Sequence, residues 1–540
     1  MFNNREMIEK SKIIMAYSDL FQTNKRKKED IISIIKSLGL KKSLILVSQF
    51  STMDYKQSMI LKNEYLRSFN KYISAEKLKE AKSQYIFSPQ SLLNLYKWLL
   101  SYGELNDEAL TPIEGKDILQ LLHLELITAD YLDEKDLNLS TYLLQNLFFS
   151  KKRDMGNDIL RAFYIYTELS KKEELYDKNE FVDFNTEFEK RYGYTIKEYL
   201  AVCFGLYTTM KKDKIELSIS WANEIDNYFS NSLLKDVAPK IIDDLMTDIS
   251  SLCTWSKKTI DNQWDYSAFL NRPLLEVEKG KFIAFNKDGL ENAIYMGLFH
   301  KIRECYPKED TKFISFLGRP FEKYVEILVE KSISQAKIPY QLIPEFVYEK
   351  NGNKRSSDLY IKEGNNLIII EVKNAKPTVK TTYQGDEESI NRDLQKLFIS
   401  PLLQEDKAYK AILNSNFREV FDGVTNIYII TLNNENIPPV WSLYDKVYKE
   451  VDGKLHPNVR GFFNFSIDEF EVFCNLITRR RPIFRVLNHL VSLKNISPLI
   501  DMLRSSSLPV KRTEWLNLQL KESLSQIINM NFKMKDGKGL

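Results

Sequence analysis

The spacing of apolar residues predicts helices over the first part of the chain. Up to about residue 265, prolines are rare and apolar positions recur with the period of about 3.6 residues that is typical of an amphipathic helix. Ser88-Pro89 is typical of an N-cap followed by proline at the first helical position, and Gly103 stands where that helix should end. Thr111-Pro112 repeats this pattern before Ile118–Ile127. An all-helical region is therefore predicted over residues 1–265.

The pattern changes after residue 265. Residues 272–285 favour a short hairpin and a helix follows, so residues 266–310 are interpreted as a connector. Residues 311–480 alternate between helix and strand and are predicted to form an α/β domain, and residues 481–540 a helical tail. The elements expected in the α/β domain are a helix at Gly318–Ala336, strands at Glu345–Glu349, Ser356–Ile361 and Leu367–Lys373, a helix at Glu387–Leu413 and a strand at Ile427–Leu432.

Residues 356–373 carry the candidate chemistry. Two β-rich runs flank Gly364-Asn365, a pair that is typical of a tight hairpin turn. If the loop consists of these two residues, Asp358 lies directly opposite Glu371. Lys373 then shares their face, because side chains alternate along a strand. A loop longer by an even number of residues keeps this arrangement approximately, whereas a shift by one residue breaks it.

Two opposed carboxylates predict a bound cation. Their Cβ atoms are expected about 5 Å apart, and at an effective dielectric constant of about 20 their repulsion is roughly 3 kcal/mol. A divalent cation offsets this repulsion, and oxygen ligands favour magnesium or manganese. Lys373 beside the pair is suited to orient an attacking water or to neutralise charge that develops on a phosphate. The alternative is that all three are ordinary polar strand residues that face solvent.

The helix before the hairpin offers a further acid. When its residues are placed at steps of about 100°, the apolar ones form a single stripe. Glu322 falls at the edge of that stripe, Glu326 lies further out, and Glu330 is on the opposite side. Glu322 is therefore expected to reach a site beside the sheet, and the alternative is a surface acid that flanks the core.

The order helix–strand–strand–strand–helix–strand, with G-x-x-x-E, then S-D, then I-I-I-E-V-K, resembles the PD-(D/E)xK nuclease superfamily. The resemblance covers about residues 318–432. It implies a mixed sheet flanked by helices, with Asp358 and Glu371 as ligands of magnesium or manganese. It also implies that Lys373 is the catalytic lysine and that Glu322 is the acid found on the first helix of many members.

Three residues bear on how closely the chain follows the superfamily. Ser357 stands where the motif that names the superfamily has proline. Gln404 and Tyr409 are similar to the Gln-Tyr motif of one branch, but their spacing is one residue too long. The alternative for these two is an ordinary surface position and an ordinary core position of a helix.

Basic residues bracket the hairpin strands at Lys354, Arg355, Lys376 and Lys380. Lys354, Arg355 and Lys376, together with Gln404, are candidate contacts to nucleic acid, because basic and amide side chains commonly bind backbone phosphates. The alternative is that the basic residues are solvated parts of turns.

Composition and the absence of other motifs narrow the function. The formal net charge is only +3, so overall basicity does not argue for nucleic-acid binding, although a local basic cleft is compatible with it. Scattered cysteines and histidines argue against a zinc ribbon or a disulfide framework. The sequence lacks G-x-x-x-x-G-K-[ST], so ATP hydrolysis through a P-loop is not expected. A cytoplasmic protein without membrane contact is expected, because neither a signal peptide nor a long apolar run is present.

These observations favour a magnesium-dependent endonuclease that hydrolyses phosphodiester bonds in DNA rather than RNA, and the resemblance extends this to restriction or anti-phage defence. Two alternatives stay open. One is a nuclease of DNA repair or junction processing, and the other is a non-catalytic nucleic-acid-binding scaffold that kept the fold. The helical region is assigned to recognition, regulation or partner binding, and a homodimer or a protein partner through it stays open.

Overall fold

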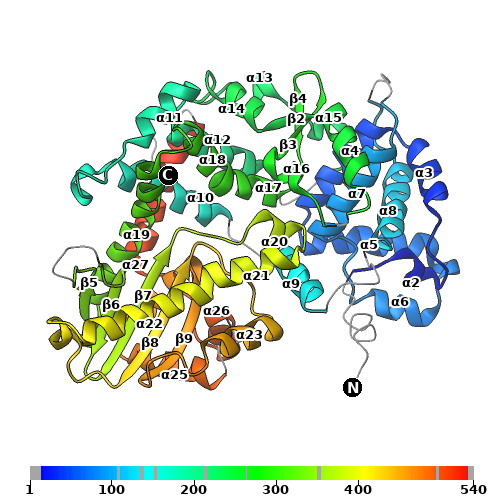
Figure 1. Cartoon of the computed structure of the whole chain (residues 1–540). Helices are drawn as coiled ribbons and strands as arrows, with labels where there is room; N and C mark the ends of the chain where they lie inside the picture. Colours follow the sequence, from blue (N-terminus) through cyan, green and yellow to red (C-terminus); the bar gives the residue numbers. More distant parts are fainter. Residues whose placement is uncertain are drawn as a thin grey trace.

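The computed structural model describes residues 14–105, 110–132, 139–150, 155–210, 216–262, 264–348, 354–493 and 498–532. Within these residues, helices surround a smaller sheet of four strands and a larger sheet of five. The N-terminal helices lie at one end of the molecule and the larger sheet lies at the other (Figure 1). The predicted mixture of helix and strand is therefore confirmed, and the larger sheet holds the candidate site.

The N-terminal helices pack around one hydrophobic core with two later helices and part of the smaller sheet. They are α2 (Tyr17–Phe21), α3 (Lys28–Lys36), α4 (Leu40–Thr52), α5 (Tyr55–Phe69), α6 (Ala75–Ala81), α7 (Pro89–Tyr102) and α8 (Gly115–Ala129), and the later two are α15 (Ile249–Thr259) and α16 (Ser267–Asn271). Helix α7 confirms the expected start and end signals. The Ser88 side chain caps it, Pro89 is its first residue, and it ends at Gly103.

Thr111-Pro112 was expected to begin the next helix, and that prediction is wrong. Helix α8 begins at Gly115, where Glu114 is the N-cap and forms a reciprocal capping box with Asp117. The Asp117 carboxylate accepts a hydrogen bond from the Glu114 backbone N–H at 2.8 Å. These later side chains satisfy the free N–H groups of the first turn, so the helix starts three residues after proline.

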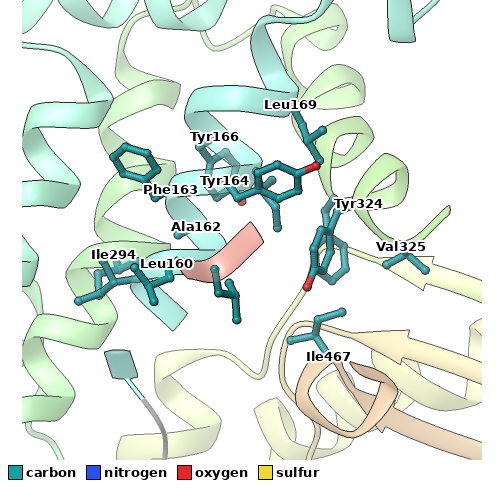
Figure 2. Close-up of a cluster of buried hydrophobic side chains, with 14 of the residues drawn as sticks. Leu160, Ala162, Phe163, Tyr164, Tyr166, Leu169, Ile294, Tyr324, Val325 and Ile467 are labelled. Carbon is teal, nitrogen blue, oxygen red and sulfur yellow. The ribbon is translucent and has the colours of Figure 1, made fainter. Parts of the chain in front are cut away.

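A second group of helices shares a core with one face of the larger sheet and with the C-terminal helices. The group comprises α10 (Met155–Phe163), α11 (Phe184–Tyr192), α12 (Ile196–Thr209), α13 (Ile225–Tyr228), α14 (Ala238–Leu245), α17 (Lys287–Asn292), α18 (Leu298–Glu304) and α19 (Thr311–Ser334). The C-terminal helices are α24 (Ile467–Ile477), α25 (Ile483–Ser492), α26 (Leu499–Ser505) and α27 (Glu514–Asn531). Figure 2 shows Leu160 of this core beside Ile294 and Tyr164 toward Tyr324. Packing therefore crosses the boundaries expected at residues 265, 310 and 480.

The smaller sheet corrects the prediction that residues 1–265 are entirely helical. Its strands are β1 (Asn223–Glu224), β2 (Met246–Asp248), β3 (Leu274–Glu278) and β4 (Lys281–Ala284). The β3–β4 hairpin was expected. Strand β1 adds antiparallel to β4, and β2 adds parallel to β3. Both added strands satisfy backbone groups on the open edges of the hairpin, and they are too short to leave a period-2 pattern in the sequence.

The larger sheet has the strand order β5-β6-β7-β8-β9. The strands are β5 (Gln341–Pro344), β6 (Leu359–Glu363), β7 (Asn366–Lys373), β8 (Asn426–Asn433) and β9 (Val459–Ser466). Strand β6 runs antiparallel to both of its neighbours, β5 and β7, and β8 and β9 run parallel to β7. The sheet is therefore mixed.

Helices cover both faces of this sheet. Ile368 and Ile370 face the core that contains α19, α24 and α25. Leu367 and Ile369 face the opposite core, which is formed mainly by α21 (Glu387–Leu394), α22 (Ser400–Leu413) and α23 (Trp441–Val451). A π-helical turn at Gln395–Ile399 joins α21 to α22, and these two helices cross the sheet in Figure 1. The short α9 (Leu139–Ser150) and α20 (Val379–Tyr383) lie beside each other.

The hairpin register follows the prediction. Leu359 pairs with Ile370 and Glu363 pairs with Asn366, so Gly364 and Asn365 form the two-residue loop. Gly364 has a φ of 57°, which glycine adopts without the steric cost that a Cβ imposes. The same register, continued by one residue, brings Asp358 opposite Glu371.

The strand before the hairpin lies earlier than expected. The prediction placed it at Glu345–Glu349, but β5 is Gln341–Pro344, and Glu349 lies outside the described residues. Side-chain hydroxyls accept hydrogen bonds from backbone N–H groups that could otherwise pair with a neighbouring strand. The Phe346 N–H donates to Ser356 Oγ at 2.9 Å, and the Ser357 N–H donates to the Tyr360 hydroxyl at 3.0 Å. For the same reason β6 begins at Leu359 rather than at Ser356.

Candidate active site

The hairpin and two helices bring the candidate side chains together. Asp358 immediately precedes β6, and Glu371 and Lys373 belong to β7. Because Tyr360 and Ile369 face the core under α22, the alternation of side chains places Asp358, Glu371 and Lys373 toward that helix as well. The long β7 is buried along most of its length, so it gives the site a rigid base.

Hydrogen bonds hold the two predicted acids in place. The Val372 backbone N–H donates to Asp358 Oδ2 at 2.7 Å, which closes the last step of the hairpin through a side chain. Lys373 Nζ donates to Glu371 Oε1. The Glu371 side chain is 6% exposed and that of Lys373 is 40% exposed, so the lysine connects a buried acid to solvent.

A fourth carboxylate, which the sequence analysis missed, completes the site. Glu405 of α22 is 1% exposed. Its Oε2 accepts a hydrogen bond from the Ser357 hydroxyl, and its carboxyl also hydrogen-bonds that of Glu371. A hydrogen bond between two carboxyl groups requires that one of them carries a proton. The raised pKa of Glu405 assigns this shared proton to the Glu405 carboxyl.

The sequence analysis named the neighbour of Glu405 instead, and the structure agrees with its alternative of an ordinary surface position at Gln404 and an ordinary core position at Tyr409. Gln404 is exposed on α22 and faces away from the sheet, whereas Tyr409 is buried against Phe421 in the core, at 5.4 Å between ring centroids. Glu405 lies one helical turn before Tyr409, on the buried stripe that also contains Leu402. The signal in the sequence that could have identified Glu405 is an acidic residue on the apolar stripe of a helix. Comparison with a Gln-Tyr motif directed attention to the residue beside it.

Burial and mutual repulsion change the protonation of these acids. Burial raises the pKa of Asp358 well above its ordinary value, and the charges of Glu371 and Glu322 raise it further, against the opposing effects of the Val372 N–H and Lys373. Burial also raises the pKa of Glu405, and the nearby Glu371 adds to the shift. The described arrangement therefore favours neutral carboxyls that retain protons above the usual range.

Glu322 lies at the edge of this group, as predicted. Arg319, one turn earlier in α19, donates to Glu322 Oε2 at 2.7 Å. Burial raises the pKa of Glu322, and the charges of Arg319 and Lys373 oppose that shift. By contrast, Glu326 pairs with Lys323 on the helix surface at 2.7 Å. Glu322 is therefore within electrostatic reach of the hairpin site.

The basic residues that were predicted to contact nucleic acid differ in their surroundings. Arg355 pairs with Glu345 at 3.1 Å and with Glu180 at 3.0 Å. Lys376 lies over the Tyr295 ring, 5.6 Å from its centroid, and lines a small cavity with several acids. Lys354 and Lys380 are exposed. Arg355 is therefore held by carboxylates, and Lys376 faces the second group of helices.

The donor set fits a hard divalent cation, although the side chains as described do not form a coordination sphere. Among the described residues, no group of three or more histidine, cysteine, aspartate and glutamate side chains is arranged to hold a metal ion. In this arrangement Lys373 and Glu405 contact the Glu371 carboxylate, and the Val372 N–H donates to Asp358 Oδ2. Asp358, Glu371 and Glu405 nevertheless converge as oxygen donors, which magnesium and manganese prefer. Cation binding would require loss of the shared proton and movement of the lysine.

Two further results bear on classification. In the part of the chain that the structure describes, no helix combines the length and the apolar character needed to cross a membrane. Comparisons with protein-family models, with curated proteins and with solved structures find no match to this chain.

Proposed function

We propose that this chain is a magnesium-dependent nuclease with a PD-(D/E)xK-type domain that hydrolyses phosphodiester bonds in DNA. The observation that carries the proposal is the convergence of Asp358, Glu371 and the buried Glu405 beside Lys373. Buried like charges are costly, and such costs concentrate at functional sites. The order α19, β5, β6, β7, α21–α22 and β8 supports the same assignment.

Asp358, Glu371 and Glu405 are the residues that would hold magnesium or manganese. They offer only oxygen donors. The proton shared between Glu371 and Glu405 neutralises one negative charge that a bound cation would otherwise balance. When bound, the cation supplies positive charge that stabilises negative charge developing on a phosphate. The Val372 N–H orients the Asp358 carboxylate, and the Ser357 hydroxyl orients that of Glu405.

Lys373 is the residue suited to act on the phosphate or on an attacking water. Burial lowers its pKa, but Glu371 and Asp358 outweigh that effect, so its net pKa is raised and the ammonium form persists at neutral pH. With its side chain 40% exposed, it can turn from Glu371 toward a substrate oxygen. There it would neutralise developing charge or orient water by hydrogen bonding.

The proposal is tested by cleavage of supercoiled plasmid, linear, branched and phage DNA, and of RNA, with magnesium, with manganese and with EDTA. Wild type is compared with Asp358→Asn and Lys373→Met, and the exposed Gln404→Ala serves as the matched control. The expected result is metal-dependent DNA cleavage by wild type and Gln404→Ala that both other variants lack.

Each departure from that result has a definite meaning. Equal cleavage by all four proteins would show that the activity lies elsewhere and would overturn the proposal. Cleavage of RNA but not DNA would overturn the substrate assignment and keep the site. Nucleic-acid binding without cleavage in either metal would replace the nuclease with a non-catalytic scaffold.

A further inference from the structure

Two arginines beside the candidate site converge on one carboxylate of the helical region. Arg319 Nε lies 3.3 Å from Glu180 Oε2, and Arg355 lies 3.0 Å from Glu180 Oε1. Arg319 also pairs with Glu322 at 2.7 Å. The two arginines come from different elements, α19 and the segment before β6. Glu180 lies in the helical region and therefore connects two elements that pack around the larger sheet.

The segment that carries Glu180 is anchored on α19. Glu180 ends a turn in which its backbone N–H donates to the Asp177 carbonyl at 3.0 Å. Tyr176 and Phe181 on either side of the turn pack edge-on against Phe316 of α19, with ring centroids 5.0 Å and 5.4 Å away. Phe316 lies about one helical turn before Arg319. The aromatic contacts therefore hold the acid at the height of the arginines.

The arginine pair matches a phosphate as well as it matches a carboxylate. Guanidinium groups bind both through charge-assisted hydrogen bonds of the same geometry. Because Arg319 contacts Glu322 of the candidate site, a phosphate held by the pair would lie next to the reacting region. All three side chains are partly exposed, and ion pairs in that setting are weak, typically below about 1 kcal/mol. A substrate phosphate can therefore replace the carboxylate at little cost.

We infer that Arg319 and Arg355 form a clamp for a backbone phosphate of nucleic acid, and that Glu180 occupies this clamp until substrate displaces it. This inference rests on the proposed function for its ligand. It assigns the helical region a regulatory contact, because the anchored Glu180 competes with substrate. It also gives Arg355 a role in binding phosphate through the nitrogen that Glu180 now occupies, while its other nitrogen stays paired with Glu345 at 3.1 Å.

Binding measured without cleavage tests the clamp. Fluorescence anisotropy in EDTA reports the affinity of the full chain for labelled duplex DNA, single-stranded DNA and RNA. Glu180→Gln is expected to bind about 3- to 10-fold more tightly than wild type, because two arginines lose a competing acid. Glu173→Gln, at an exposed acid in the same segment, is the matched control and is expected to have a much smaller effect.

The arginine variants complete the test. Arg319→Gln and Arg355→Gln are each expected to weaken binding and to reduce the salt slope by about one. Adding Arg355→Gln to Glu180→Gln should remove the gain in affinity. Equal affinities of Glu180→Gln, Glu173→Gln and wild type would overturn the clamp. If wild type cleaves DNA but Glu180→Gln binds it no more tightly than wild type, the clamp is refuted and the nuclease stands. If the affinities change as expected but no variant and no wild type cleaves, the nuclease is refuted and the clamp stands.

Discussion

Replacing Glu405 with glutamine examines the buried acids most directly. Burial and the charge of Glu371 raise the pKa of Glu405 in the folded protein. A carboxyl whose folded-state pKa lies above its unfolded value of about 4 contributes stability below that pH, and this contribution is lost as pH rises through the folded-state pKa. Without a cation, wild type is therefore expected to lose stability as pH rises from about 4 toward the raised pKa of Glu405.

The contact between Glu405 and Glu371 sets the size of the effect. Two unit charges about 4 Å apart at an effective dielectric constant of about 20 repel by about 4 kcal/mol. Solvent screens this little, since the two residues are 1% and 5% exposed. Glutamine keeps an acceptor for the Ser357 hydroxyl and a donor for Glu371 but carries no charge. Relative to wild type, Glu405→Gln should therefore gain stability by up to about 4 kcal/mol as pH rises above the raised pKa of Glu405, and it should differ little below about pH 4.

The assay is urea unfolding in EDTA over a series of pH values for wild type, Glu405→Gln and the exposed Gln404→Ala. The Glu405→Gln midpoint should separate from the other two only as pH rises. Parallel pH dependences for all three proteins would refute the shared proton. With magnesium added, wild type should gain more stability at higher pH, because cation binding releases that proton, and the gain should depend less on pH in Glu405→Gln.

Three further predictions concern neighbouring features. Lys373→Met should reduce cleavage by about 100-fold or more while magnesium still raises the melting temperature, and a variant that cuts normally would remove the lysine from the reaction. Asp358→Asn keeps an acceptor for the Val372 N–H but should lose most of the magnesium-dependent rise in melting temperature. Arg161→Leu should destabilise the fold by about 3–5 kcal/mol in urea. The reason is that the buried Arg161 pairs with the fully buried Glu471 at 2.6 Å, and its loss leaves a buried carboxylate with less compensating charge. A destabilisation below about 1 kcal/mol would show that this ion pair contributes little to the stability of the fold.

The hairpin site could be predicted because its information is local. Alternation of side chains and the Gly364-Asn365 turn are properties of a short stretch, and together they determine which residues oppose each other. That logic placed Asp358, Glu371 and Lys373 on one face before any tertiary contact was known. The apolar stripe of α19 placed Glu322 at the edge of the site in the same way. The element order around the hairpin was also predictable, although the strand at β5 was placed too late.

The sequence by itself therefore determined the hairpin, the mixture of helix and strand and the first candidate residues, because each depends on the periodicity of neighbouring positions. Only the tertiary structure decided that Glu405 rather than Gln404 joins the site, because this depends on which face of α22 packs on the sheet. Only the tertiary structure placed Glu180 between Arg319 and Arg355. That contact joins segments far apart in the chain, and its energy comes from charge and aromatic packing rather than from any local pattern.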